Sequence, residues 1–236
     1  FPSCVMLRIL FQDEYFVAVH KPPGLLVHRT RISQDQEFLL QRLRKQLKQK
    51  LYPVHRLDRA TAGVIVFALS SEAARRFSEM IQERKISKIY LAIVRGYTPE
   101  SGTIDHPLKK DGVGVLQEAV SHFSRLAIAE LSIPVSRYPT ARYSLVEVRP
   151  ETGRMHQIRR HFNHLRHPIL GDRKHGPRHH NRMWREQFQS EMLMLLARKL
   201  EFQHPFTHRD VFLETSPEPE MERMMNTLNW EQKLLQ

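Results

Sequence analysis

A carboxylate between two arginines is the feature of this sequence best suited to chemistry. Asp58 lies within the segment His55–Gly63, with Arg56 and Arg59 near it on either side, just before the apolar run 64–69. A neighbouring guanidinium group stabilises the charged form of a carboxylate, so Asp58 is expected to be ionised and able to act as a nucleophile. Side chains alternate along an extended segment, which places Arg56 and Asp58 on the same side. Taken alone, the pattern is also typical of a salt-bridged turn.

Positive charge is concentrated in two parts of the chain. There are 37 Lys and Arg against 25 Asp and Glu, which gives a net charge of +12. Residues 149–186 hold ten Lys or Arg, seven His and only three acids, and residues 42–50 hold five basic residues and no acid. Such clusters suit a polyphosphate partner, because each phosphate that is neutralised releases condensed counterions. The alternative is a basic surface that only promotes solubility.

The composition excludes several classes of protein. A chain of 236 residues can bury a stable core, and its single cysteine, Cys4, excludes an internal disulfide or a multi-cysteine zinc site. No apolar run approaches the roughly 18 residues that a membrane span needs, and no signal-like segment opens the chain. We therefore expect a cytoplasmic protein without a membrane partner. Residues 1–6 are interpreted as an N-terminal extension or upstream remnant without a role in function.

Hydrophobic periodicity predicts the elements that position these residues. Alternation predicts a strand, and apolar residues at intervals of three and four predict a helix. Strands are expected at 7–11, 15–20, 88–94, 120–126, 143–148, 195–202 and 211–213, and helices within 35–51, 70–85, 155–165 and 219–228. Turns are expected at Gly102, Asp111–Gly112 and Gly114, and His179 and His180 are expected in a basic loop. The arrangement of residues 113–140 stays open.

Four motifs, in their order and spacing, are similar to those of one enzyme family. They are Lys21–Gly24, His55–Gly63, Lys88–Gly96, and Gly153–Arg159 together with Pro168–Asp172. With these motifs the chain resembles the RluA-type pseudouridine synthases over about residues 7–215. The resemblance implies one catalytic domain over residues 7–236, without a separate N-terminal RNA-binding module. Its fold would be α+β (mixed α/β), with an extended, largely antiparallel mixed sheet flanked by helices and a central catalytic cleft.

The resemblance also implies an activity and the residues that perform it. Enzymes of this family detach uracil from its ribose, turn the base and rejoin it through carbon 5, without a metal or cofactor. Asp58 matches the family's nucleophile, which attacks either the sugar or the base. Tyr90 matches the tyrosine that could stack on uracil and relay the proton lost from carbon 5, and Arg159 matches the arginine that pairs with the aspartate. Ile158 would pack against the base.

A uridine inside an RNA helix must be flipped out before it can reach a carboxylate in a cleft. By resemblance, Arg56 is the candidate to fill the gap that the base leaves. The other residues that we expect to contact the RNA are Lys21, His55, Arg154, His156, Arg160 and Lys174. The basic segments 42–50 and 154–185 would hold the RNA, and the chain is expected to act as a monomer.

The RNA target is predicted from two further segments. Arg137–Tyr143 and Arg159–Pro168 resemble the branch of the family that modifies uridine 65 of tRNA, so this is the expected substrate. The alternatives are another tRNA or rRNA uridine, a non-catalytic RNA-binding protein, and a glycoside hydrolase that uses Asp58 with a second acid. One residue departs from the family pattern, because Ala62 stands where the family usually has Ser.

Simpler roles exist for several of these residues. Taken alone, Tyr90 is typical of an aromatic residue in a strand, and Arg159 of an ion pair on a helix surface. His161, His164 and His167 are three residues apart, which differs from the i, i+4 spacing of helical zinc sites. The agreement of the four motifs favours the catalytic interpretation for Tyr90 and Arg159, and no metal is expected.

Overall fold

The computed structural model describes residues 6–28, 37–110 and 114–230. Backbone contacts divide the chain into two compact units. Unit 1 comprises Phe1–Lys88 and Ala197–Ser216, and unit 2 comprises Ile89–Leu196 and Pro217–Gln236. Residues 1–5 of the predicted N-terminal extension and the predicted turn at Asp111–Gly112 lie outside the described residues.

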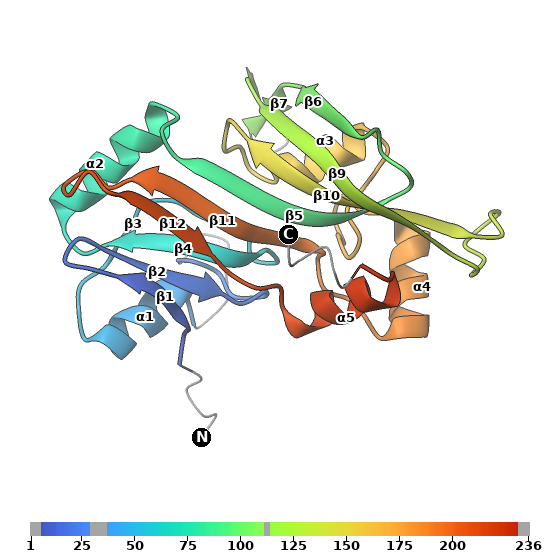
Figure 1. The fold of residues 1–236 in the computed structure, drawn as a ribbon, viewed down its shortest axis with the longest axis horizontal. Coiled ribbons are helices and arrows are strands. Elements are labelled where there is room, and N and C mark those ends of the chain that lie inside the picture. The colour runs from blue at the N-terminus through green and yellow to red at the C-terminus, as the bar shows by residue number, and fades with distance from the viewer. Residues whose placement is uncertain (1–5, 29–36, 111–113, 231–236) are drawn as a thin grey trace. The chain divides into compact units, whose positions relative to one another are not determined.

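Unit 1 is built on antiparallel strands (Figure 1). They are β1 (Ile9–Gln12), β2 (Phe16–Lys21), β3 (Tyr52–Pro53), β4 (Ala62–Ala68), β11 (Leu195–Gln203), which enters this unit at Ala197, and β12 (Asp210–Glu214). Backbone pairing joins β1 with β2, β2 with β4, β3 with β4, and β11 with β12, each antiparallel. All seven residues of β4 are buried, as its apolar sequence predicts.

Two helices complete unit 1, and both lie within the ranges predicted from the sequence. The helix α1 (Leu39–Leu47) buries Leu39, Leu40 and Leu43. The helix α2 (Ser71–Gln82) begins after Ser70, whose hydroxyl accepts a hydrogen bond from the Ala73 N–H at 3.1 Å. The buried face of α2 packs into a core that includes Phe16 and Phe202.

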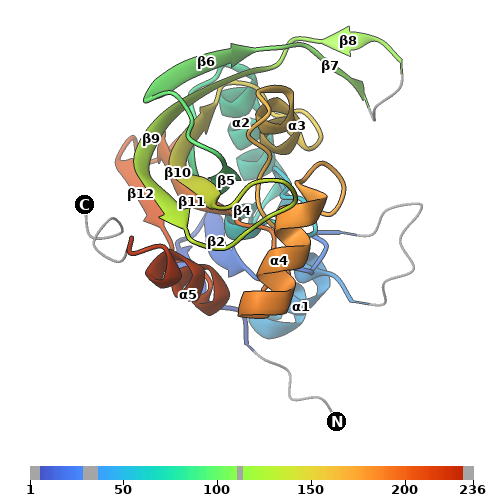
Figure 2. The same cartoon turned by 90° about the vertical axis from the view of Figure 1, so that its right-hand side faces the viewer.

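Unit 2 is built on a second set of antiparallel strands (Figure 2). They are β5 (Ser87–Arg95), which enters this unit at Ile89, β6 (Ser101–Asp105), β7 (Leu108–Lys109), β8 (Leu116–Gln117), β9 (Val120–Leu131) and β10 (Ala141–Pro150). The strand β10 pairs with β5 on one side and β9 on the other, and β9 also pairs with β6. Its helices are α3 (Gln157–His164), α4 (Arg178–Phe188) and α5 (Pro219–Thr227). The mixed α/β class and the largely antiparallel sheet strands with flanking helices are confirmed.

Two sequence predictions in unit 2 were wrong. His179 and His180 lie in helix α4 and not in a loop, and Gly102 lies within strand β6 and not in a turn. The helix is held by its buried side, where the Tyr143 hydroxyl accepts a hydrogen bond from Trp184 Nε1 at 2.8 Å and lies 2.9 Å from His180 Nδ1. Burial lowers the pKa of His180 to about 4, so this histidine is neutral near pH 7.

No helix among the described residues is long and apolar enough to cross a membrane.

Gly63, five residues after Asp58, tests how closely strands β4 and β11 pack. Its φ of +125° lies in the region that favours glycine, and a Cβ there would stand 2.2 Å from the Ala197 carbonyl oxygen. We expect Gly63→Ala to lower the free energy of unfolding by at least about 2 kcal/mol, because the β4 and β11 backbones must move apart. Thermal and denaturant unfolding would measure this. Gly153→Ala is the matched control, since nothing lies within 4 Å of its Cβ position, and equal stability of both variants would contradict the account.

Candidate active site

In unit 1, a buried lysine anchors the loop that carries Asp58, which we call the Asp58 loop (residues 54–61). Lys21 is 0% exposed, and its Nζ donates to the carbonyl oxygens of Pro22, Leu25 and Arg59 at 2.8, 2.9 and 3.1 Å. The Gly24 N–H also donates to the Arg59 carbonyl at 2.8 Å, and Arg59 Nε donates to the Gly24 carbonyl at 3.0 Å. The motifs 21–24 and 55–63 are therefore joined through Arg59, one residue after Asp58. RNA binding by Lys21 stays a prediction, and the contact that the structure shows is this anchoring one.

The side chains of the Asp58 loop alternate between interior and surface. Leu57 is buried, whereas Arg56 is exposed and Asp58 is partly exposed. The Thr61 N–H donates to the Asp58 carbonyl oxygen at 3.1 Å, which closes a tight turn before strand β4. This exposure agrees with the prediction that Arg56 and Asp58 project from the same side of the segment.

His55 fixes the start of the same loop to strand β4. Its Nε2 accepts a hydrogen bond from the Val66 N–H at 2.9 Å, so the ring carries its proton on Nδ1 when neutral. Burial, and secondly the positive charge of Lys88, lowers the pKa of His55 well below its usual 6.5. The predicted contact of His55 with RNA stays a prediction, and in this structure its ring supports the loop.

In unit 2, Gln157 organises the turn that precedes helix α3. Its Oε1 accepts from the Thr152 hydroxyl at 2.7 Å and the Arg154 N–H at 3.0 Å. Its Nε2 donates to the Val120 carbonyl at 2.9 Å and the Ser121 hydroxyl at 3.0 Å. One buried amide thereby joins the 152–154 turn to strand β9 and sets where α3 begins.

Arg159 is held by a buried carboxylate in the same unit. Its Nε and Nη2 donate to Asp172 Oδ2 and Oδ1, both at 2.8 Å, and the two side chains are only 8% and 1% exposed. Such a two-point contact fixes the plane of the guanidinium group as well as its position. The Lys174 and His175 N–H groups also donate to Asp172 Oδ1, at 2.9 and 3.0 Å.

These contacts decide the charge state of Asp172. Burial acts to raise the pKa of its carboxyl group, but the hydrogen bonds from Arg159 and from the two backbone N–H groups outweigh burial and lower the pKa below its usual 3.8. Asp172 is therefore an anion near pH 7, and it holds Arg159 as a cation within a region that excludes most water.

The other predicted site residues on helix α3 and in the flanking segments are close in sequence to Arg159 or Asp172. Ile158 is buried, and His156 precedes α3 in a left-handed conformation with its Nδ1 at 3.1 Å from His175 Nε2. Arg160 Nη1 donates to the Lys109 carbonyl at 3.0 Å and Arg154 Nε to the Glu118 carbonyl at 2.9 Å. Lys174 is exposed.

Tyr90 lies on strand β5, where it pairs in register with Val148 of strand β10. The neighbouring Ile89 and Leu91 are buried, and Tyr90 is partly exposed, as the predicted alternation requires. The structure places Asp58 and Arg56 in unit 1, and Tyr90, Arg159 and the helix α3 residues in unit 2. The catalytic roles of these residues stay predictions.

Two important residues of this region were not assigned a role from the sequence. Asp172 and Gln157 both belong to quoted motifs, but their partners are distant in the chain: Asp172 binds Arg159 and Gln157 binds strand β9. A signal was present for Asp172, since an acid within a strongly basic segment needs a cationic partner when buried. Within the described part of the chain, no three His, Cys, Asp or Glu side chains are grouped so as to hold a metal ion.

Comparisons with known proteins agree with the motifs. The family model described as RNA pseudouridylate synthase matches residues 15–164. The tRNA pseudouridine synthase C of Vibrio parahaemolyticus is 43% identical over 242 residues, covering 98% of each chain. The protein of the same name from Haemophilus ducreyi is 43% identical over 234 residues, covering 95% of this chain and 96% of its own. The solved structure of human RNA pseudouridylate synthase domain containing 4 has a TM-score of 0.73 and 27% identity, covering 94% of this chain and 93% of that one.

The chain belongs to the RNA pseudouridylate synthase family. It is therefore an enzyme, an isomerase that rearranges a nucleoside without adding or removing atoms overall. The family and the class of enzyme predicted from the four motifs are both confirmed.

The lowered pKa of His55 predicts how stability varies with pH. A histidine whose folded-state pKa is lowered contributes stability that is fully present above its unfolded value of 6.5 and is lost as the pH falls toward the folded value. The variant His55→Gln keeps an acceptor for the Val66 N–H but does not titrate. We expect it to be less stable than wild type at pH 8, with a deficit that shrinks as the pH falls below 6.5. Thermal unfolding across this range would measure the difference, and a constant deficit would contradict the assignment.

Removal of the Asp172 charge predicts a large loss of stability. Asp172→Asn leaves the buried Arg159 guanidinium without a counter-charge, which should cost about 3–5 kcal/mol. The contribution of the native pair is fully present above the usual pKa of 3.8 and is lost as the pH falls through the lower folded value, so the difference should narrow in acid. Denaturant unfolding at several pH values would test both statements. Glu79→Gln, which breaks the exposed Arg75–Glu79 pair, is the control and should cost less than about 1 kcal/mol; an equal loss in the two variants would refute the role of the buried pair.

Proposed function

We propose that this enzyme converts uridine 65 of tRNA into pseudouridine. The observation that carries the substrate is the 43% identity, over almost the whole of both chains, to relatives named tRNA pseudouridine synthase C. The concentration of ten Lys or Arg within residues 149–186 supports a polyanionic partner. An rRNA uridine is the alternative target that the experiment below distinguishes.

The proposed reaction uses Asp58 as the nucleophile. The bond from the ribose C1′ to uracil N1 breaks, a bond from C1′ to C5 forms, the C5 proton leaves and N1 gains a proton. The Asp58 carboxylate forms a transient covalent bond, either at C1′ or at C6 of the base, and is released at the end. The anchoring of the Asp58 loop by Lys21 supports this role, because a nucleophile must be held within a fraction of an ångström of its target.

Arg159 and Tyr90 have supporting roles in this proposal. Arg159 pairs with the carboxylate of Asp58 and aims it, and its fixed contact with Asp172 favours such a function, since a planar guanidinium group orients a carboxylate best when it cannot rotate. Tyr90 stacks on the uracil and relays the proton from C5, which suits a partly exposed aromatic side chain on a rigid strand. Ile158 packs against the base.

The target uridine must leave its helix, at a cost of a few kcal/mol. We propose that Arg56 enters the space left by the base, which its exposed position in the Asp58 loop permits. The residues of both units act as one catalytic domain, as a monomer, in the cytoplasm. Arg154, His156, Arg160, Lys174 and the basic segment 42–50 would contact the RNA around the site.

Replacement of Asp58 tests the proposed reaction. Asp58→Ala should bind a tRNA transcript with the affinity of wild type but lower turnover by at least about 10⁴-fold, the scale on which loss of a nucleophile acts. Carbodiimide treatment followed by primer extension locates pseudouridine and would score its formation at position 65. Asp105→Asn, an exposed acid on strand β6, is the control and should retain activity.

Two outcomes would contradict the proposal. Pseudouridine formation by Asp58→Ala would exclude Asp58 as the nucleophile. Modification of a tRNA whose uridine 65 is replaced by cytidine, or of an rRNA stem-loop in preference to tRNA, would retain the chemistry but exclude the proposed target.

A further inference from the structure

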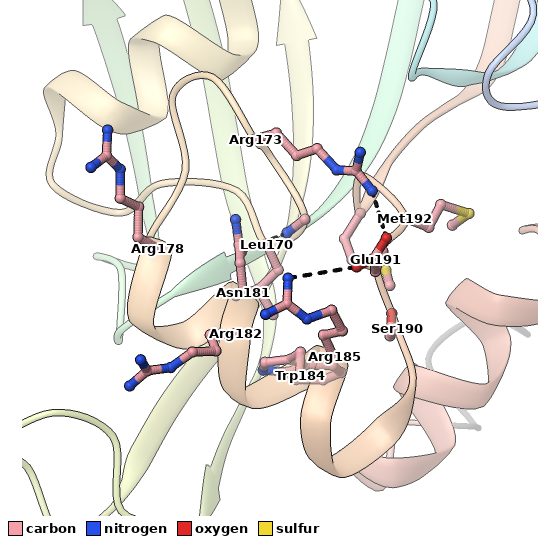
Figure 3. Close-up of a pocket in the computed structure, with 12 residues that line it drawn as sticks. Leu170, Arg173, Arg178, Asn181, Arg182, Trp184, Arg185, Ser190, Glu191 and Met192 are labelled. Atoms are coloured by element: carbon pink, nitrogen blue, oxygen red, sulfur yellow. Dashed lines mark hydrogen bonds and ion pairs between the residues drawn. The ribbon is translucent and has the colours of Figure 1, made fainter.

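A cavity of about 250 Å³ lies within unit 2, between helix α4 and the segment 190–194. It is smaller than the roughly 300–1,000 Å³ of pockets that hold drug-sized ligands or cofactors, so it suits a single charged group. Its rim carries Arg173, Arg178, Arg182 and Arg185, with Glu191 as the one acid among the lining residues. Figure 3 shows these side chains around helix α4.

Three of the arginines form a stripe along one face of α4. Arg178, Arg182 and Arg185 follow at intervals of four and three, which places them one above another on the helix surface. All three are exposed, whereas Met183 and Trp184 on another face are buried. Like charges at such spacing repel one another by a few tenths of a kcal/mol per pair, so an anionic ligand would stabilise this face.

Helix α4 is hydrogen-bonded to the segment that contains Asp172, the partner of Arg159. Asn181 Oδ1 accepts from the Gly171 N–H at 2.9 Å, and its Nδ2 donates to the Asp172 carbonyl at 3.0 Å. The helix that carries the arginine stripe is therefore fixed to Gly171 and Asp172. Asp172 is also the partner of Arg159.

Glu191 neutralises only part of this positive charge. It forms an ion pair with Arg173 at 2.6 Å and lies 3.7 Å from Arg185, as the dashed lines in Figure 3 indicate. Within residues 6–28, 37–110 and 114–230, Arg178 and Arg182 have no ion-pair or hydrogen-bond partner for their side chains. Their guanidinium groups point away from Glu191 in Figure 3.

We propose that this arginine stripe binds one phosphodiester of the tRNA backbone, and that Glu191 competes with the RNA for Arg173 and Arg185. The proposal rests on the proposed function for its choice of tRNA. In this proposal α4 has a positioning role. Arg178 and Arg182 hold the RNA in register, and Glu191 lowers the affinity for RNA so that the product can leave. A contact with phosphate carries no sequence information, so this site would position the RNA without reading its bases.

The salt dependence of binding tests the stripe directly. The double variant Arg178→Gln/Arg182→Gln should bind an unmodified tRNA transcript about tenfold more weakly at low salt, and the slope of log K against log[KCl] should decrease by about one, the value for one lost phosphate contact. Filter binding with the full chain over a series of KCl concentrations would measure both. Arg8→Gln/Arg209→Gln removes two exposed arginines from unit 1 and is the charge-matched control. Equal affinity and slope in the two double variants would overturn the proposal.

Two further arms separate a phosphate contact from a structural effect. Arg178→Lys/Arg182→Lys should restore most of the slope, because lysine also neutralises a phosphate, whereas failure to restore it would overturn the contact. Glu191→Gln should tighten binding several-fold, and unchanged or weaker binding would overturn the competition.

At saturating tRNA the Arg178→Gln/Arg182→Gln variant should keep the wild-type kcat with a raised KM. Because affinity is measured apart from turnover, a wild-type protein that binds tRNA but forms no pseudouridine would refute the proposed function and leave this inference standing.

Discussion

The buried pair of Arg159 and Asp172 is the interaction on which the arrangement of unit 2 depends. Removing two charges from water costs several kcal/mol per ion, so the pair is stable only when its geometry and its remaining hydrogen bonds are satisfied. Both requirements are met, since the two N–H···O contacts are 2.8 Å long and two backbone N–H groups bind the same carboxylate. The turn after Gly171, the start of α4 and the position of Arg159 on α3 are thereby fixed together.

Unit 1 uses a comparable device around its own candidate catalytic residue. The ammonium group of Lys21 is fully buried among three carbonyl oxygens, one of which belongs to Arg59 next to Asp58. A buried cation tolerates little displacement of its partners, because an unsatisfied charge would be far more costly than a lost neutral hydrogen bond. In both units a buried charged group, hydrogen-bonded to near neighbours and to one partner farther along the chain, sets the position of a side chain expected to act in catalysis.

The local elements were predictable from the sequence, and the long-range contacts were not. Apolar spacing located α1 and α2, and the Ser70 cap located the start of α2, because those signals are contained within a few residues. The helix α4 was missed because its buried residues, Met183 and Trp184, are adjacent in sequence and give no helical spacing, and because His180 contacts Tyr143, a partner 37 residues away. The four motifs identified the family and its expected residues, but no spacing rule links Asp172 to an arginine thirteen residues earlier or predicts that Lys21 is buried.

The proposed mechanism requires that a rigid guanidinium fork, fixed by Asp172, orients the reacting carboxylate. The variant Arg159→Lys keeps the charge and removes the fork, so it tests orientation apart from electrostatics. The measurement is the single-turnover release of tritium from a tRNA transcript labelled at C5 of its uridines, because C5 loses its hydrogen when pseudouridine forms. The account predicts release at least about 100-fold slower than wild type with unchanged tRNA affinity, as expected for a misplaced reacting group. Release at the wild-type rate would contradict it.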